Sequence, residues 1–357
     1  MLKKMTLLSL FVGLCACGGQ KEDQSAEAPA APATEDSAPA AAAGDGPLPL
    51  SATDVLGGFE GTVTGLALSR NPDSVLDSAV IVGNGAAGLA LVPTSQTRNA
   101  TMIDFGGAVA AATATQSEGG PLIVVERADG RVSFRTFGAN RDSLQEIAAL
   151  EPGALAGRPR ALCALEDHVF RIDADGGVTV ISARTGAEGP SFETTVIRTD
   201  PALDCTAAGD RIYVLKRDGR IAAFNPDGTV LIANVADLPG TNRIAAMPLT
   251  EGAPVIFAVL DDGTVRTGET VFRLKVAGQP VAVDRLAFGR GNFGAVYRNG
   301  VAAIVTSSQG LVVLSWLALA DQLSLAEDTR PMPPSTSSEM SAPVTIEVPD
   351  LALPTQD

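Results

Sequence analysis

The stretch from Val169 to Ile181 reads VFRIDADGGVTVI, and the stretch from Ile212 to Phe224 reads IYVLKRDGRIAAF. Each contains a run of apolar and β-branched residues, an Asp-Gly pair and a second such run. Asp-Gly between two runs of this kind signals a β-hairpin, because glycine supplies the positive φ that the turn needs. The two stretches therefore predict two hairpins of the same design.

The same hairpin unit recurs along the middle of the chain. Its tips are Asn84-Gly85, Asp129-Gly130, Asp175-Gly176, Asp218-Gly219, Asp262-Gly263 and Gln309-Gly310. Successive tips are separated by 45, 46, 43, 44 and 47 residues. This near-constant period is typical of the four-stranded blades of a β-propeller. We therefore predict an all-β fold, a six-bladed β-propeller, over residues 51–325.

Three local expectations follow from the repeat. Residues 61–69 alternate in polarity before the first full unit, so they are expected to complete the last blade and close the ring. Helical periodicity is almost absent, and its best candidate is residues 141–150. The aspartates of the tips are predicted to be turn residues rather than metal ligands.

The N-terminus has the features of an export signal. Two lysines, Lys3 and Lys4, precede an apolar run over residues 5–16 that is too short to span a bilayer core of about 30 Å. Residues 1–16 are therefore predicted to be a signal peptide, and no later apolar run reaches the length of a membrane-spanning helix. The chain is thus expected to leave the cytoplasm.

The signal ends on Leu14-Cys15-Ala16-Cys17-Gly18, which resembles the lipobox of bacterial lipoproteins. The match predicts lipidation of Cys17 and anchoring to a membrane through that lipid, with Gly18 favouring the outer membrane. The alternative is a plain secretory signal with incidental cysteines. A lipoprotein facing the periplasm is the localisation that we expect.

Two flanking segments differ in composition from the body. Residues 17–50 are rich in Ala, Pro and acidic residues, and residues 326–357 contain six prolines. Both are predicted to be disordered, the first as a tether and the second as a tail. The formal net charge of -15 disfavours nucleic acid and anionic lipid surfaces as partners.

Several motifs, in the register of the repeat, resemble those of the β-propeller phytases. The run from Asp77 to Gly83, DSAVIVG, is similar to that family's D-P-A-I-W-V strand. Ala161-Leu162-Cys163 resembles its Y-G-L-C, and the run from Ala202 to Cys205, ALDC, its P-E-G-C. The run from Phe293 to Gly300 and the triplet Leu314-Ser315-Trp316 follow two further motifs near the end.

The resemblance implies a calcium-dependent site at one end of the propeller channel. In such a phytase, carboxylates bind several Ca²⁺ ions, and the ions hold phosphate and activate a water. Carried over residue by residue, Asp77, Asp104 and Asp284 match acids of the family pattern. We therefore predict these three as calcium ligands, with an Asx-turn role as the alternative for each.

Other positions depart from the family pattern. Leu203 stands where the family has the glutamate of P-E-G-C, and Lys216 and Arg217 lie over two adjacent carboxylates. A cation in place of a ligand adds repulsion and removes the donor oxygens. Lys216 and Arg217 are interpreted as a solvated hairpin rim, with an anion-binding pair as the alternative.

Two functions from different classes are therefore carried forward. The first is a binding or scaffold module with a degraded calcium and phosphate site, which binds a periplasmic or outer-membrane protein. The second is a calcium-dependent phosphomonoesterase acting on phytate with a reduced ligand set. A sugar- or lactone-binding propeller unrelated to phytases is a third hypothesis.

The remaining candidate site residues are two cysteines and the one histidine. Cys163 and Cys205 are expected at equivalent first-strand positions of adjacent blades, in a chain exported to an oxidising compartment. A disulfide and two buried free thiols both stay open. His168 is the sole histidine, which excludes a His-rich zinc site within one chain and disfavours a Ser-His-Asp triad.

Overall fold

The fold is described from a computed structural model. The described residues are 47–52, 59, 61–71, 78–85, 88–94, 101–105, 107–117, 120–138, 143–186, 189–249, 252–294, 296–308, 310–323 and 325. They belong to one structural unit that begins at Gly46. The predicted signal peptide, Cys17, the tail and Asp77 lie outside the described residues. Where described, the chain contains no helix long and apolar enough to span a membrane.

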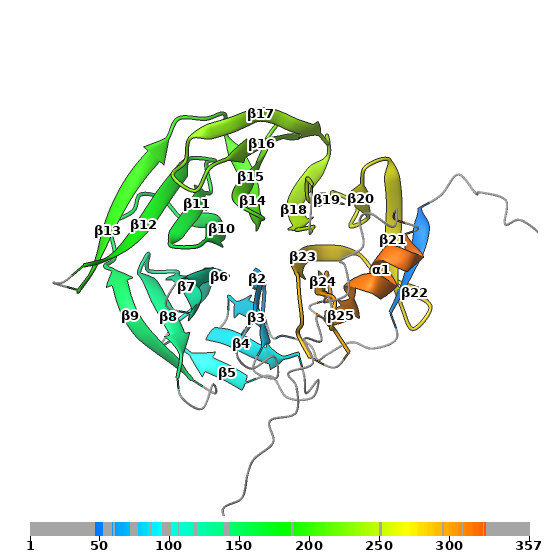
Figure 1. The fold of residues 1–357 in the computed structure, drawn as a ribbon, viewed down its shortest axis with the longest axis horizontal. Helices are drawn as coiled ribbons and strands as arrows, with labels where there is room; N and C mark the ends of the chain where they lie inside the picture. The colour runs from blue at the N-terminus through cyan, green and yellow to red at the C-terminus, as the bar shows by residue number, and fades with distance from the viewer. Residues whose placement is uncertain are drawn as a thin grey trace, which may run out of the picture. The chain divides into compact units, whose positions relative to one another are not determined.

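Six sheets surround a central channel, as a six-bladed β-propeller requires (Figure 1). Blades 1 and 2 each have four strands in sequence order, β2 (Val63–Ser69), β3 (Ala79–Asn84), β4 (Gly88–Pro93) and β5 (Thr101–Asp104), then β6 (Val109–Ser117), β7 (Gly120–Arg127), β8 (Val132–Phe137) and β9 (Leu144–Leu150). Blades 3 and 4 repeat the pattern with β10 (Pro159–Leu165), β11 (His168–Asp173), β12 (Val178–Gly186) and β13 (Gly189–Ile197), then β14 (Ala202–Ala208), β15 (Arg211–Lys216), β16 (Arg220–Phe224) and β17 (Val230–Asp237).

The last two blades depart from this pattern. Blade 5 consists of β18 (Thr241–Met247), β19 (Val255–Leu260), β20 (Val265–Thr267) and β21 (Thr270–Val276), with β22 (Gln279–Pro280) and β1 (Leu48–Ala52) added to β21. Within the described residues, blade 6 has the three strands β23 (Val283–Gly289), β24 (Val301–Thr306) and β25 (Leu311–Ser315), followed by helix α1 (Trp316–Gln322). Because β1 starts at Leu48, the folded body begins before the start at residue 51 that the sequence predicts.

The predicted hairpins form the second and third strands of each blade. At the Asp-Gly tips, Gly130, Gly176, Gly219 and Gly263 have φ values of 87°, 97°, 90° and 74°. The tip aspartates accept from the backbone N–H two residues on, as in Asp262 Oδ1 with Thr264 N at 2.9 Å. The turn role predicted for these aspartates is confirmed.

Two local expectations are wrong. Residues 61–69 do not complete the last blade, because β2 is the innermost strand of blade 1 and pairs with β3. Blades 6 and 1 meet instead through side chains, and Thr94 Oγ1 donates to the carbonyl oxygen of Phe293 at 2.7 Å. Residues 141–150 hold strand β9 rather than a helix, since pairing with β8 overrides local propensity.

Among the described residues, the core contains seven apolar clusters. Six of them lie one between each pair of neighbouring blades, and the seventh consists of Phe293, Tyr297 and Val301. Successive residues of a strand point to opposite faces of its sheet. Thus Val80 and Val82 pack toward blade 6, whereas Ile81 packs toward blade 2. Inner strands such as β3 and β24 are buried at every position, which explains why they are apolar along nearly their whole length. The outermost strand β17 is exposed along most of its length.

Each innermost strand has a β-bulge close to its start. The bulged positions are Thr64, Ala110, Arg160, Leu203, Asn242 and Asp284. Hydrogen bonds connect these regions around the ring, for example from Arg285 Nε to the carbonyl oxygen of Val63 at 3.2 Å. The bulges therefore lie at one end of the channel, where they redirect the adjacent side chains.

Candidate functional site

The predicted calcium ligands occupy different parts of the propeller. Asp77 lies outside the described residues, Asp104 ends the outermost strand β5, and Asp284 lies at the bulge of the innermost strand β23. Asp284 Oδ2 is 3.6 Å from Arg285 Nε. Within the described residues, no group of three His, Cys, Asp or Glu side chains is arranged to hold a metal ion. Calcium binding stays a prediction.

The innermost strands enclose a cavity of about 130 Å³ along the channel. Small residues such as Gly65, Ala112 and Ala164 line it, because six strands converge there. A Cβ on Gly65 would lie 2.6 Å from the backbone of Ala112, so the close approach of β2 and β6 requires glycine. The large polar side chains in this wall are therefore exceptions among mostly small residues.

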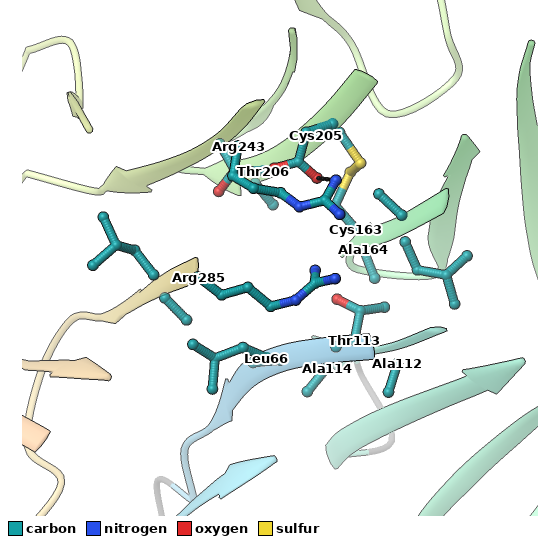
Figure 2. A pocket seen from close by; sticks show the side chains of 18 of the residues that line it. Leu66, Ala112, Thr113, Ala114, Cys163, Ala164, Cys205, Thr206, Arg243 and Arg285 are labelled. Carbon is teal, nitrogen blue, oxygen red and sulfur yellow. Dashed lines mark ion pairs between the residues drawn. A yellow bond between two sulfur atoms is a disulfide. The ribbon is translucent and has the colours of Figure 1, made fainter. Parts of the chain in front are cut away.

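Two arginines reach into the cavity from neighbouring blades. Arg243 follows the bulge of β18 and Arg285 follows that of β23, and Figure 2 shows both guanidinium groups directed into the pocket. A third, Arg160, lies at the bulge of β10 and lines an adjoining hollow that it shares with Arg243 and Asp284. The bulges thus gather three cations at one channel end.

Main-chain carbonyl oxygens hold these arginines in place. Arg160 Nε donates to the carbonyl oxygen of Leu203 at 2.7 Å, and Arg243 Nη1 approaches the same oxygen at 3.5 Å. Arg285 binds Val63 through Nε alone. Among the described residues, Nη1 and Nη2 of Arg160 and Arg285 have no hydrogen-bond partner in the protein. Several guanidinium N–H donors are therefore available to a ligand.

One buried acid accompanies the arginines. Asp204 follows the bulge of β14, and its side chain is 7% exposed. Its Oδ2 accepts from the backbone N–H of Ile244 at 2.9 Å, and its Oδ1 lies 3.9 Å from Arg243 Nη1, the ion pair dashed in Figure 2. Burial raises the pKa of Asp204 above its usual value, and Arg243 opposes this rise.

The cations at the channel end raise one another's electrostatic energy. Burial, and then the charge of Arg243, lowers the pKa of Arg285 to about 10. The pKa of Arg160 is lowered in the same way, first by burial and then by Arg243. The adjoining hollow contains Asp261, Asp262 and Asp284 in addition to Arg160 and Arg243. The cavity is lined by two arginines and one acid, Asp204, so its charged side chains carry a net positive charge. An oxyanion is the ligand type that would relieve this repulsion.

A disulfide between Cys163 and Cys205 forms part of the cavity wall, with a Cα–Cα distance of 5.8 Å. The two positions are not equivalent, which corrects the sequence-based expectation. Ala161 and Asp204 each follow their bulge, so Cys163 corresponds to Thr206. Equivalent residues point to the same side of successive blades, and only positions offset by one can face each other.

The structure also shows the surroundings of the remaining sequence-based candidates. Lys216 is buried rather than solvated, with Nζ 3.2 Å from Asp200 Oδ2, whereas Arg217 is exposed and donates to the carbonyl oxygen of Asp175. The rim interpretation is therefore wrong for Lys216. His168 begins β11, and its Nδ1 has no hydrogen-bond partner among the described residues.

Sequence reasoning missed the arginines of the channel end. Their signal is an arginine at the start of an innermost strand rich in small residues, as in PRALCA from Pro159, TNRIAA from Thr241 and VDRLAF from Val283. These arginines precede the following tips at Asp175, Asp262 and Gln309 by 15, 19 and 24 residues. Alignment on the tips alone therefore does not superimpose the arginines.

Comparison with known proteins shows no family for this chain. No protein-family model and no curated protein matches the chain. Among solved structures it is similar to a crystal structure of BBS1N in complex with ARL6DN, soaked with mercury, with 14% identity and a TM-score of 0.43 over 71% of this chain and 77% of the other. The same complex soaked with lead gives 14% identity and a TM-score of 0.43 over 66% and 74%.

Proposed function

We propose that the protein is a non-catalytic binding module, a propeller whose arginine-lined channel end binds a ligand carrying a phosphate or carboxylate group. The observation that supports this function is the convergence of Arg160, Arg243 and Arg285, with Asp204 as the buried acid among them. Partly buried guanidinium groups with unpaired N–H donors form strong charge-assisted hydrogen bonds to oxyanions.

The proposal includes the relationship that the sequence motifs suggest. The chain would be a diverged relative of the β-propeller phytases in which guanidinium groups bind the anion directly, without bridging calcium ions. Leu203 in the place of a family glutamate supports this view, because a leucine side chain has no carboxylate to offer to a calcium ion. Direct binding of this kind needs no metal.

The module would act outside the cytoplasm, tethered through a lipid on Cys17 to the outer membrane. The lipobox-like sequence and the Cys163–Cys205 bridge support this location, since disulfides persist in oxidising compartments. The ligand would then be a periplasmic small molecule or an anionic group on a periplasmic or outer-membrane protein.

Isothermal titration with sulfate, phosphate and phytate in the presence of EDTA tests the proposal. The protein is residues 17–357 with Cys17→Ser, which cannot be acylated. We expect each variant, Arg243→Gln and Arg285→Gln, to bind at least about tenfold more weakly, since one charge-assisted contact contributes about 1.5–3 kcal/mol. Arg184→Gln is the matched control, because Arg184 is 72% exposed and pairs with Glu193 at the surface. Equal affinity in all three variants would contradict the proposal.

A calcium-dependent phosphomonoesterase is the second candidate function. The position of Asp284 favours it, because this predicted ligand lines the same hollow as Arg160 and Arg243. Binding of phytate that requires calcium, is lost in EDTA and is abolished by Asp284→Asn would support this candidate over direct arginine binding.

A further inference from the structure

The Cys163–Cys205 bridge lines the same cavity as the channel arginines. The cavity wall includes both cysteines together with Arg243 and Arg285, and Figure 2 shows the sulfur atoms beside the pocket. The cysteines are 4% and 7% exposed, and on their other side they pack into the apolar cluster between blades 3 and 4. The channel is therefore the route by which a small reagent meets the sulfur atoms.

The charge of Arg243 and Arg285 bears on which small reagents enter the cavity. A disulfide is opened by a thiolate, and the rate depends on access and on how well the leaving thiolate is stabilised. Arg243 and Arg285 attract anions into the cavity, and their charge also favours the thiolate released from the bridge. A thiol that carries an additional negative charge gains from both effects.

We propose that the Cys163–Cys205 bridge is a thiol-exchange site reached through the arginine-lined channel, and that its preferred reactant is an anionic low-molecular-weight thiol. The inference uses the same arginines and thus rests on the proposed function. It adds a reactive group and a reactant class to a site that otherwise only binds.

The exchange proceeds in two balanced steps. A thiolate attacks the Sγ of one cysteine, the S–S bond breaks, and a mixed disulfide forms while the other cysteine leaves as a thiolate. A second small thiolate then attacks the mixed disulfide and releases the first cysteine. Two molecules of the small thiol are oxidised to one disulfide, with loss of two electrons in total. The bridge is reduced to two thiols after protonation.

The test compares three small thiols that differ in charge. Oxidised residues 17–357 with Cys17→Ser are treated in low salt with 3-mercaptopropionate, 2-mercaptoethanol or cysteamine at equal thiolate concentration. Released thiols are alkylated with iodoacetamide and counted by mass spectrometry over time. We expect the anionic thiol to react at least about tenfold faster than the cationic one, and the ratio to fall toward one in high salt.

Variants assign the preference to the arginines. Arg243→Gln and Arg285→Gln should each reduce the rate ratio several-fold, and Arg285→Lys should retain most of it. The surface control Arg184→Gln should leave the ratio unchanged. Saturating sulfate should slow the anionic thiol selectively, because it occupies the same guanidinium groups. Circular dichroism of each variant confirms that the fold is intact.

Two outcomes would overturn the inference. The first is equal rates for the three thiols, and the second is no reaction of the native protein with a thiol that reduces the denatured chain. Sulfate titration of the oxidised protein is measured separately and tests the proposed function. Sulfate binding without charge preference would refute the exchange site alone, whereas absence of sulfate binding would refute the binding function.

Discussion

At the scale of single residues, a buried ion pair connects blades 2 and 3. Arg171 Nε and Nη2 donate to the two carboxylate oxygens of Glu126 at 2.8 Å, and both side chains are essentially inaccessible. The same guanidinium group donates to the carbonyl oxygens of Ala156 and Gly157 at 2.9 Å and contacts Asp173. Every N–H of Arg171 is therefore used within the protein, which distinguishes it from the channel arginines.

We predict that Glu126→Gln lowers the free energy of unfolding by about 3 kcal/mol, because it leaves the Arg171 charge buried without its main partner. Glu193→Gln is the matched control, since Glu193 and Arg184 form a surface pair with side chains 59% and 72% exposed. That pair should contribute less than about 1 kcal/mol. Urea unfolding of the two variants measures the difference, and equal losses would contradict a special role for the buried pair.

The acid at the channel end predicts a pH dependence of anion binding. Burial raises the pKa of Asp204 above its usual value of 3.8, so its charge is lost as the pH falls from neutral toward that value. The neutral acid no longer offsets the arginines, and sulfate affinity should therefore increase in this window. By the same shift, the contribution of Asp204 to folding stability decreases as the pH rises through its raised pKa.

Asp204→Asn should remove this pH dependence and raise sulfate affinity at neutral pH by about tenfold, as expected for one neutralised charge a few ångströms away in a partly screened site. The asparagine oxygen can still accept from the N–H of Ile244, so the fold is retained. Titrations between pH 4 and 8 measure the effect, for which sulfate is suitable because it keeps its charge over this range. Parallel pH profiles for the two proteins would show that Asp204 is not the titrating group.

At the scale of secondary-structure elements, the hairpin tips also connect neighbouring blades. Ala202, Leu238 and Val283, at or just before innermost strands, donate their N–H to the carbonyl oxygens of the tip glycines Gly176, Gly219 and Gly263 at 2.9 Å. A Cβ on Gly263 would lie 2.4 Å from the Cβ of Ala282. These glycines therefore serve both the turn and the contact between blades.

We predict that Gly263→Ala lowers the free energy of unfolding by about 3 kcal/mol, from a strained positive φ together with a clash between blades. Gly130→Ala is the matched control, because Gly130 has a similar φ of 87° and nothing within 4 Å of the added Cβ. It should cost only about 1 kcal/mol. Denaturant unfolding of the two variants separates the cost of the positive φ from the cost of the clash. Similar losses would mean that Ala282 moves aside without a measurable free-energy cost.

Sequence reasoning predicted the hairpins but not how the innermost strands align. The Asp-Gly tips depend on local backbone conformation, so the residues themselves report them. The bulges depend on pairing between strands and have no residue signature, since Thr64, Arg160 and Leu203 all occupy the position. The offset of one between Cys163 and Cys205 is already present in the sequence, since the cysteines are 42 residues apart and the tips Asp175 and Asp218 are 43 apart. The gathering of the arginines became visible only in three dimensions.

At the scale of the whole molecule, the number of blades could be predicted because the repeat period is nearly constant. Closure of the ring could not, because it depends on side chains of distant segments. Val80 and Val82 of blade 1 pack against Val305 and Leu311 of blade 6, and no strand of the described residues is shared between these blades. The outer position on blade 5 is taken by β1, a segment that composition alone had assigned in part to the tether.

The proposed membrane anchor predicts a specific covalent modification. When the full chain is expressed in a bacterial host supplied with a labelled fatty acid, the label should be incorporated into the wild type and into Cys15→Ser. It should be absent from Cys17→Ser, because the lipobox-like sequence places the acceptor thiol at Cys17. Incorporation into Cys17→Ser with loss in Cys15→Ser would contradict the assignment.

The last prediction separates binding from catalysis on the same ligand. We expect the protein to bind phytate at the channel end but to release little or no phosphate from it, even with millimolar calcium at neutral pH. Arginine donates hydrogen bonds and carries charge, but it neither accepts a proton nor supplies a nucleophile at this pH. Asp204, the buried acid among these arginines, is already bound to Ile244 and Arg243.

The positions that depart from the family pattern support the same expectation. Leu203 has no carboxylate, and Lys216 is held by Asp200 rather than directed at a ligand. A phytase activates water through several shared calcium ions, so losing part of the ligand set removes phosphate positioning and nucleophile together. Phosphate release is measured by colorimetric assay with calcium or with EDTA. Calcium-dependent turnover that is abolished by Asp77→Asn, Asp104→Asn or Asp284→Asn would instead identify a working phosphomonoesterase and place its metal site at those acids.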